Sequence, residues 1–296
     1  FKQKTAYEIP KRDWSSDVCS SDLSVRQARF GGLLDLATKR SLARAFAAEP
    51  PAIVQSWMSR ATQHTPSGRY IRVGWLGGYY APRTFRACDH VVAVTPNIVR
   101  HLRDGGFSAE RAHYIPTFAT AQAGPAVARG SLTTPDGAPL LLALGRLHPK
   151  KGFDVLLQAL ADIPFAYLWI AGDGELDAEL RALAARLGVA DRVRFLGWRN
   201  DREALLAACD VCVMPSRYEP FGTVMIEAWA AQRPLVVAAA AGPRGLVRDG
   251  VDALLVPIDD ADALAKAVRR VLESPDLALT LAEAGFAVYQ QCYTAA

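Results

Sequence analysis

Two glutamates, Glu219 and Glu227, stand at the ends of the segment "EPFGTVMIE". Pro220 and Gly222 predict a bend between a strand and a helix that begins at Thr223. The first N–H groups of a helix lack partners and lie at the positive end of its dipole, so the bend predicts an anion site. A carboxylate before this turn would be repelled by a bound diphosphate, so Glu219 is expected to face hydroxyl groups.

Glu227 falls within "VMIEAWA", a helical run that is otherwise apolar. A carboxylate on such a face is costly to bury unless it is hydrogen-bonded, and the diol of a ribose would supply two donors. Each glutamate also has a simpler interpretation. Glu227 can be a surface residue of a helix, and Glu219 can be a loop charge or a helix cap.

Arg146 and Lys151 flank a Leu-His-Pro turn after the predicted strand "LLLALG". An arginine can bind two phosphate oxygens and a lysine acts as a point charge, so the pair suits a diphosphate. The alternative is two solvated loop cations. The sequence contains no complete GxGxxG, the fingerprint of dinucleotide-binding domains. Other candidates that follow predicted strands are Gly145, Gly172, Gly197 and Trp198.

Strands and helices alternate along the chain, and the strands after residue 139 are almost continuously apolar. This pattern predicts a parallel sheet with helices on both faces, whose ligands bind at the carboxyl ends of the strands. The later strands are expected at 140–145, 166–172, 193–197, 211–216, 234–242 and 253–257, and the last helix at 260–274. The earlier half predicts helices at 33–49 and 96–106 and strands at 52–57, 70–76, 90–95 and 112–118.

The 296 residues, of which 51% are hydrophobic, allow one large domain or two ordinary ones. The net charge of +4 suits an anionic small ligand or an acidic surface better than a nucleic acid. No apolar run approaches the roughly 18 residues of a membrane span. The five scattered cysteines favour a reducing cytoplasm, and Cys209 and Cys212 are expected to be buried structural thiols rather than metal ligands.

The order of these motifs resembles the nucleotide-binding domain of retaining GT-B glycosyltransferases of the family 4 type, which include lipopolysaccharide-core and mannosyl transferases. The resemblance covers about residues 140–281, from "GRLHPKKGFDVLLQAL" through "IAGDGE" and "VRFLG" to "SRYEPFGTVMIEAWA" and "VRDGVDALLVPIDD". It implies that Arg146 and Lys151 hold the donor diphosphate, that Glu219 faces the donor sugar and that Glu227 binds the ribose. It also implies backbone contacts to the donor at Phe221, Gly222 and Thr223, and contacts to the base after "FLG", at Gly197 and Trp198.

The fold expected from this resemblance is α/β of the GT-B type, with two Rossmann-like parallel-sheet domains of which the first is incomplete. Residues 1–22 are similar to translated sequencing-adaptor sequence and are expected to be a non-native, disordered leader. Residues 23–130 would form a partial acceptor domain and residues 131–296 the nucleotide-sugar domain. The family's first strands, its Gly-rich acceptor loop and a histidine at the position of Leu76 or Gly77 are missing, and its return helix looks shortened.

The resemblance implies a retaining, metal-independent glycosyltransferase that needs no cofactor beyond its nucleotide-diphospho-sugar substrate. Arg146, Lys151 and the helix start at Thr223 would stabilise the leaving diphosphate, and Glu219 would orient the sugar. The acceptor would be a glycan or glycolipid of the bacterial envelope, with room for a peripheral contact with the inner membrane. The alternatives are a nucleotide-sugar-binding fragment without turnover and a GT-B epimerase, whose acidic and histidine groups are not found. A dehydrogenase is disfavoured by the missing glycine fingerprint.

Overall fold

The computed structural model describes residues 35–119 and 124–294, which form two compact units. One unit contains the described residues up to Val92 together with His101–His113, and the other contains Ala93–Arg100 and the described residues from Tyr114 onward. The expected leader, residues 1–22, lies outside the described residues. The domain boundary near residue 130 stays a prediction, since the division by contacts falls within the segment between 92 and 114.

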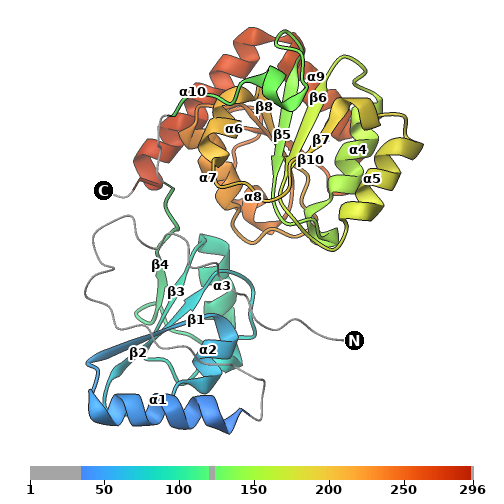
Figure 1. The fold of residues 1–296 in the computed structure, drawn as a ribbon. Helices are drawn as coiled ribbons and strands as arrows, with labels where there is room; N and C mark the ends of the chain where they lie inside the picture. Colours follow the sequence, from blue (N-terminus) through green and yellow to red (C-terminus); the bar gives the residue numbers. More distant parts are fainter. Residues whose placement is uncertain (1–34, 120–123, 295–296) are drawn as a thin grey trace. The chain divides into compact units, whose positions relative to one another are not determined.

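Four strands before residue 115 form one sheet in the order β1-β2-β3-β4 (Figure 1). β1 and β2 run parallel, with Ile53 opposite Ile71. The strands are β1 (Ile53–Trp57), β2 (Ile71–Leu76), β3 (His90–Ala93) and β4 (Ala112–Tyr114), and the helices are α1 (Leu36–Ala48), α2 (Met58–His64) and α3 (Pro96–Asp104). Helix α2 is an element that the sequence does not predict, because it is short, polar and follows β1 without a break.

The second unit contains a six-stranded sheet in the order β10-β9-β8-β5-β6-β7, in which every recorded strand pair is parallel. Its strands are β5 (Leu140–Leu144), β6 (Tyr167–Ala171), β7 (Val193–Phe195), β8 (Val211–Met214), β9 (Leu235–Ala238) and β10 (Leu254–Val256). The chain moves outward from β5 to β7, returns to place β8 beside β5, and then moves outward the other way. The direction of winding therefore reverses between β5 and β8, which is where doubly wound sheets bind ligands.

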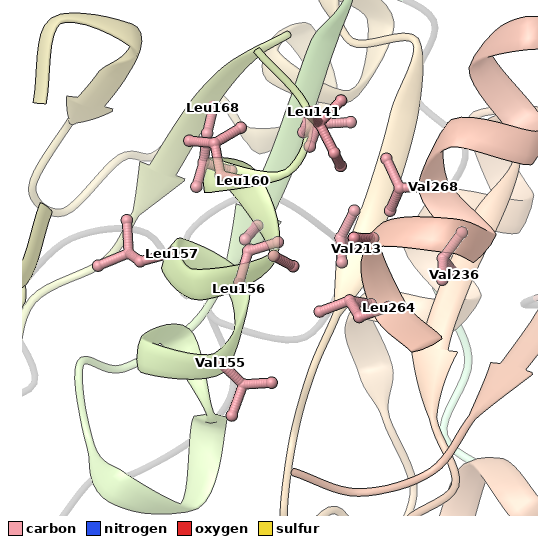
Figure 2. Packing of buried hydrophobic residues seen from close by; sticks show 14 of the residues in the cluster. Leu141, Val155, Leu156, Leu157, Leu160, Leu168, Val213, Val236, Leu264 and Val268 are labelled. Carbon is pink, nitrogen blue, oxygen red and sulfur yellow. The ribbon is translucent and has the colours of Figure 1, made fainter. Parts of the chain in front are cut away.

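Helices cover this sheet on both faces, which explains why its strands are mostly apolar; Arg194 of the edge strand β7 is an exception. Leu141 and Ala143 of β5 belong to a core with α4, α5 and α9, whereas Leu140 and Leu142 are buried outside that core. Figure 2 shows leucines and valines of α4 and α9 gathered over β5, β8 and β9. The helices are α4 (Phe153–Ala161), α5 (Asp177–Arg186), α6 (Arg202–Ala208), α7 (Thr223–Ala230), α8 (Ala241–Leu246), α9 (Ala261–Glu273) and α10 (Pro275–Cys292).

Two expectations for the last third of the chain are wrong in detail. The strand expected at 234–242 ends at Ala238, and α8 begins at Ala241, because the alanine run there suits either structure. The chain also does not end in the helix at 260–274, since α10 adds 18 residues that pack against α7 and bring Gly285 against the Trp229 ring. Of the helices in the described residues, neither α10 nor any other is long and apolar enough to cross a membrane.

The buried thiols of the second unit confirm the interpretation of "CDVC". Cys209 and Cys212 are fully buried, and neither forms a disulfide. Burial raises the pKa of Cys209 to about 12 and also raises the pKa of Cys212. Both side chains are therefore neutral packing groups at physiological pH.

Candidate active site

The loop after β5 and the loop after β8 meet at the point where the sheet reverses its winding. The carbonyl oxygen of Lys150 accepts hydrogen bonds from the N–H groups of Arg217 and Tyr218, at 2.9 and 3.1 Å. Gly152 has a φ of +66°, and a Cβ there would collide with the carbonyl group of Pro215. The two loops are thus joined by main-chain contacts that only glycine permits at position 152.

Lys151 and Glu219, one from each loop, form a direct ion pair. The Nζ of Lys151 lies 2.6 Å from Oε2 of Glu219, and the two side chains are 26% and 13% exposed. Arg146 is exposed on the same loop as Lys151. The structure therefore brings both predicted diphosphate ligands and the predicted sugar-facing carboxylate to one edge of one unit.

Arg217 fixes the loop that carries Glu219. Its guanidinium donates to both oxygens of Asp154 in α4, at 2.8 and 2.6 Å, and to the carbonyl of Pro149, and it also pairs with Asp259. Burial by itself would raise the pKa of Asp154, but the hydrogen bonds and the charge of Arg217 outweigh burial and lower it. This bidentate pair holds the Glu219 loop against the first turn of α4.

Helix α7 begins where the sequence places it, at Thr223, after Gly222 with a φ of +98°. Within the described part of the chain, no acceptor is recorded for the N–H groups of Thr223 and Val224. The Phe221 side chain is buried, and its ring packs edge-on against Tyr293 with centroids 6.0 Å apart. The backbone of this turn can therefore contact an anion while its aromatic side chain anchors it in the core.

The three predicted glycines lie side by side at the ends of β5, β6 and β7. The N–H of Gly145 donates to Ala171 at 3.0 Å, and the N–H of Gly172 donates to Gly197 at 2.8 Å. A Cβ on Gly172 would collide with the carbonyl of Gly145, so the main chains touch here as well. Trp198 is 72% exposed, and its indole N–H donates to Asn200 at 2.9 Å.

Glu227 is not the surface residue that its simpler interpretation describes. Its side chain is only 12% exposed and its Oε1 lies 3.3 Å from Nη1 of Arg202, the first residue of α6. Burial raises the pKa of Glu227, Arg202 opposes this effect and Glu203 adds to it. Glu227 and Thr223 line a pocket of about 610 Å³ with the α6 residues Arg202, Glu203, Leu206 and Ala207.

Arg202 and Arg217 are site residues that the sequence reasoning misses. The sequence offers one indication of a role for Arg202: it is a cation in the first turn of a helix, where the helix dipole disfavours positive charge. Arg217 carries none, because its partners lie 63 and 42 residues away along the chain. Two histidines make contacts within the protein: His148 accepts from the N–H of Lys150, and His90 lies 3.0 Å from His113.

A doubly wound parallel sheet with glycines, cations and carboxylates at its reversal point defines a domain of the Rossmann-like class. Residues 127–288 match the family described as "Glycosyl transferases group 1". The chain belongs to this family and is a glycosyltransferase with the GT-B fold.

A curated relative is the lipopolysaccharide core biosynthesis glycosyltransferase LpsE of Rhizobium meliloti strain 1021, which is 36% identical over 96% of this chain and 84% of its own length. Among solved structures, sucrose-phosphate synthase from Thermosynechococcus elongatus superimposes with a TM-score of 0.78 at 26% identity, over 86% of this chain and 73% of that one. The structure of Anabaena HepE in complex with UDP-glucose superimposes with a TM-score of 0.77 at 25% identity, over 87% of this chain and 78% of that one.

Proposed function

We propose that this glycosyltransferase is a retaining enzyme that transfers a sugar from a nucleotide-diphospho-sugar without a divalent metal. The observation that carries the proposal is the meeting of Lys151 and Glu219 at the reversal point of the sheet, 2.6 Å apart and beside the start of α7. A cation for a diphosphate and a carboxylate for sugar hydroxyls are thus adjacent, as a sugar joined directly to a diphosphate requires.

The chemistry needs charge stabilisation at two points. When the bond between the anomeric carbon and the diphosphate oxygen breaks, positive charge develops on the sugar and negative charge on the leaving diphosphate. Arg146, Lys151 and the N–H groups at the start of α7 would stabilise the leaving group in place of a metal ion. Glu219 would hold the sugar hydroxyls, and Glu227 would accept from the ribose.

The acceptor is proposed from the relative that covers most of the chain. LpsE is named for lipopolysaccharide core biosynthesis, so we assign this chain an envelope glycan or glycolipid, with the lipopolysaccharide core as the first candidate. HepE is described in complex with UDP-glucose, which makes UDP-glucose the first donor to test. Peripheral contact with the inner membrane is part of the same proposal, because such acceptors are membrane-bound.

The test is a transfer assay with a panel of UDP- and GDP-sugars and lipopolysaccharide core acceptors, with and without EDTA. We expect transfer that EDTA leaves unchanged, and a product whose anomeric configuration, read by NMR, matches the donor. Loss of activity in EDTA would overturn metal independence, and an inverted product would overturn retention. Donor binding without transfer to any acceptor would favour a nucleotide-sugar-binding protein without turnover.

A further inference from the structure

Glu227 is mostly buried on α7, and the cation of Arg202 reaches it from the neighbouring helix. The Nη1 of Arg202 lies 3.3 Å from Oε1 of Glu227, and no hydrogen bond to either oxygen of Glu227 is found among the residues that the structure describes. The Arg202 side chain is 57% exposed, and both residues line the same pocket. Glu227 is therefore paired with a cation through Oε1 and can still accept hydrogen bonds from a ligand.

The position of Arg202 indicates that the pair is more than a surface contact. Arg202 begins α6, where the positive end of the helix dipole disfavours a cation. Its other ionic contact, with Glu203 at 3.4 Å, joins neighbouring residues on the surface. The mostly buried carboxylate of Glu227 therefore opposes the unfavourable effect of the helix dipole on Arg202.

The other groups that face Glu227 cannot replace Arg202. Glu203 on α6 is itself negative and 32% exposed. Cys212 on β8, the strand beneath α7, is buried and neutral. Arg233 lines the same pocket at the far end of α7, where it donates to the carbonyl of Cys209. Without Arg202, Glu227 would face a buried thiol and another carboxylate.

We propose that Arg202 is a positioning residue of the nucleotide site: it holds Glu227 ionised and oriented through Oε1, so that the second oxygen can accept hydrogen bonds from the ribose of a nucleoside diphosphate. This inference rests on the proposed function, in which Glu227 binds the ribose. Arg202 would act on the ribose only through Glu227. Its loss should therefore weaken ribose binding most where Glu227 becomes protonated.

The experiment is calorimetric titration of the full chain with UDP, GDP and ADP, followed by the 2′,3′-dideoxy form of the tightest binder. Wild type, Arg202→Gln, Arg202→Lys and Glu227→Gln are compared at about pH 8 and about pH 5.5, because burial raises the pKa of Glu227 and the lower pH favours its protonation. Arg269→Gln is the control, because Arg269 is a half-exposed arginine of α9 with one carboxylate partner, Glu273. The diphosphate also changes its protonation state between these two pH values, but this change is the same for all variants. The quantity compared is therefore the ratio of each variant's dissociation constant to that of wild type at the same pH.

At the higher pH, Arg202→Gln should bind the ribonucleotide within about threefold of wild type, and at the lower pH roughly tenfold more weakly than wild type. The added loss should vanish with the dideoxynucleotide, and Arg202→Lys should restore the wild-type profile. Glu227→Gln should be weaker than wild type at both pH values.

If Arg202→Gln follows the wild-type pH profile while Glu227→Gln binds weakly, the inference about Arg202 is wrong and the proposed function is unaffected. An equal loss at both pH values, shared by the dideoxynucleotide, would show that Arg202 binds the diphosphate directly, which also overturns it. Unchanged binding by Glu227→Gln would remove the ribose assignment and the inference together, but not the roles of Arg146 and Lys151. A wild type that binds none of the three nucleotides would overturn the proposed function itself.

Discussion

Lys151 and Glu219 are 68 residues apart in the chain, and their charged groups lie 2.6 Å apart at the carboxyl edge of the sheet. Because Glu219 is 13% exposed, Lys151→Ala leaves a mostly buried carboxylate without its cation. We expect Lys151→Ala to lower the free energy of unfolding by about 1–3 kcal/mol, and Arg146→Ala, at an exposed position, to lower it by less than about 1 kcal/mol.

Denaturant titrations of Lys151→Ala, Glu219→Gln and the double variant measure the coupling directly. The double variant should be more stable than the sum of the single losses predicts, since it removes both charges. In calorimetry, Lys151→Ala and Arg146→Ala should each bind a nucleoside diphosphate at least roughly tenfold more weakly than wild type. Strict additivity in the unfolding data would mean that the ion pair contributes nothing.

The two glutamates should separate the nucleotide from its sugar. Glu227→Gln is expected to weaken binding of a nucleoside diphosphate and of its sugar conjugate alike, by about tenfold, because a ribose is present in both. Glu219→Gln should spare the bare diphosphate and weaken only the sugar conjugate, or slow its turnover. Parallel titration of both variants with UDP and UDP-glucose decides this, and equal losses for both ligands in both variants would refute the division of roles.

Gly152→Ala should disturb the site through a backbone collision. The added Cβ would meet the carbonyl of Pro215 and push the Lys151 loop away from β8. Gly188→Ala is a matched control, because Gly188 has nearly the same φ, +68° against +66°, with nothing within 4 Å of the added atom. We expect both to lose about 1 kcal/mol for the left-handed backbone, and Gly152→Ala to lose roughly 1–3 kcal/mol more.

Diphosphate affinity distinguishes these two glycine variants further. It should fall in Gly152→Ala, where Lys151 is displaced, and stay at the wild-type value in Gly188→Ala. Equal stability and equal affinity for both variants would show that the contact with Pro215 is not needed to place Lys151.

The pair of Asp154 with Arg217 should make stability depend on pH in the acidic range. The pKa of Asp154 is lowered in the folded protein, so its contribution is present above the ordinary carboxyl value near 3.8 and is lost as the pH falls through the folded value. Asp154→Asn should therefore be about 1–2 kcal/mol less stable than wild type at neutral pH, and this difference should shrink below about pH 4. A difference that stays constant down to about pH 3 would exclude the charge of Asp154 as its cause.

Cysteine reactivity should report the packing of β8. The thiols of Cys209 and Cys212 are buried and resist ionisation, whereas Cys292 at the end of α10 is exposed. Iodoacetamide at mildly alkaline pH should modify Cys292 in the folded protein and reach the other two only in denaturant, because the thiolate is the reactive form. Peptide mapping by mass spectrometry identifies each site, and rapid labelling of Cys212 in the folded state would contradict the buried position of β8.

The placement of the motifs at one edge of the sheet can be predicted from the sequence, because the carboxyl ends of parallel strands share an edge. This is why Arg146 and Glu219 could be expected near one another and why the start of α7 could be placed at Thr223. The ion pair between Lys151 and Glu219 could not be derived in this way. It depends on β8 lying directly beside β5, a strand order that the hydrophobic pattern does not encode.

Other differences have local causes. Alanines continue both strands and helices, so the end of β9 at Ala238 leaves no mark in the sequence. The run "VMIEAWA" shows that Glu227 is a carboxylate on an apolar helix face. Its partner, Arg202, cannot be read from this run because it belongs to another helix. Side-chain partners that are distant in sequence are the part of this site that only three-dimensional packing reveals.

The hydrogen bonds from Arg217 and Tyr218 to the carbonyl of Lys150 involve no side chain. Substitution at position 150 should therefore leave these two bonds in place, while it removes the contact of the Lys150 ammonium with the Tyr218 ring, 4.7 Å from the ring centroid. For protein engineering, this makes position 150 a place to vary the charge of the loop by saturation mutagenesis. The adjoining Gly152, whose backbone packs against Pro215, should be kept constant in such a library.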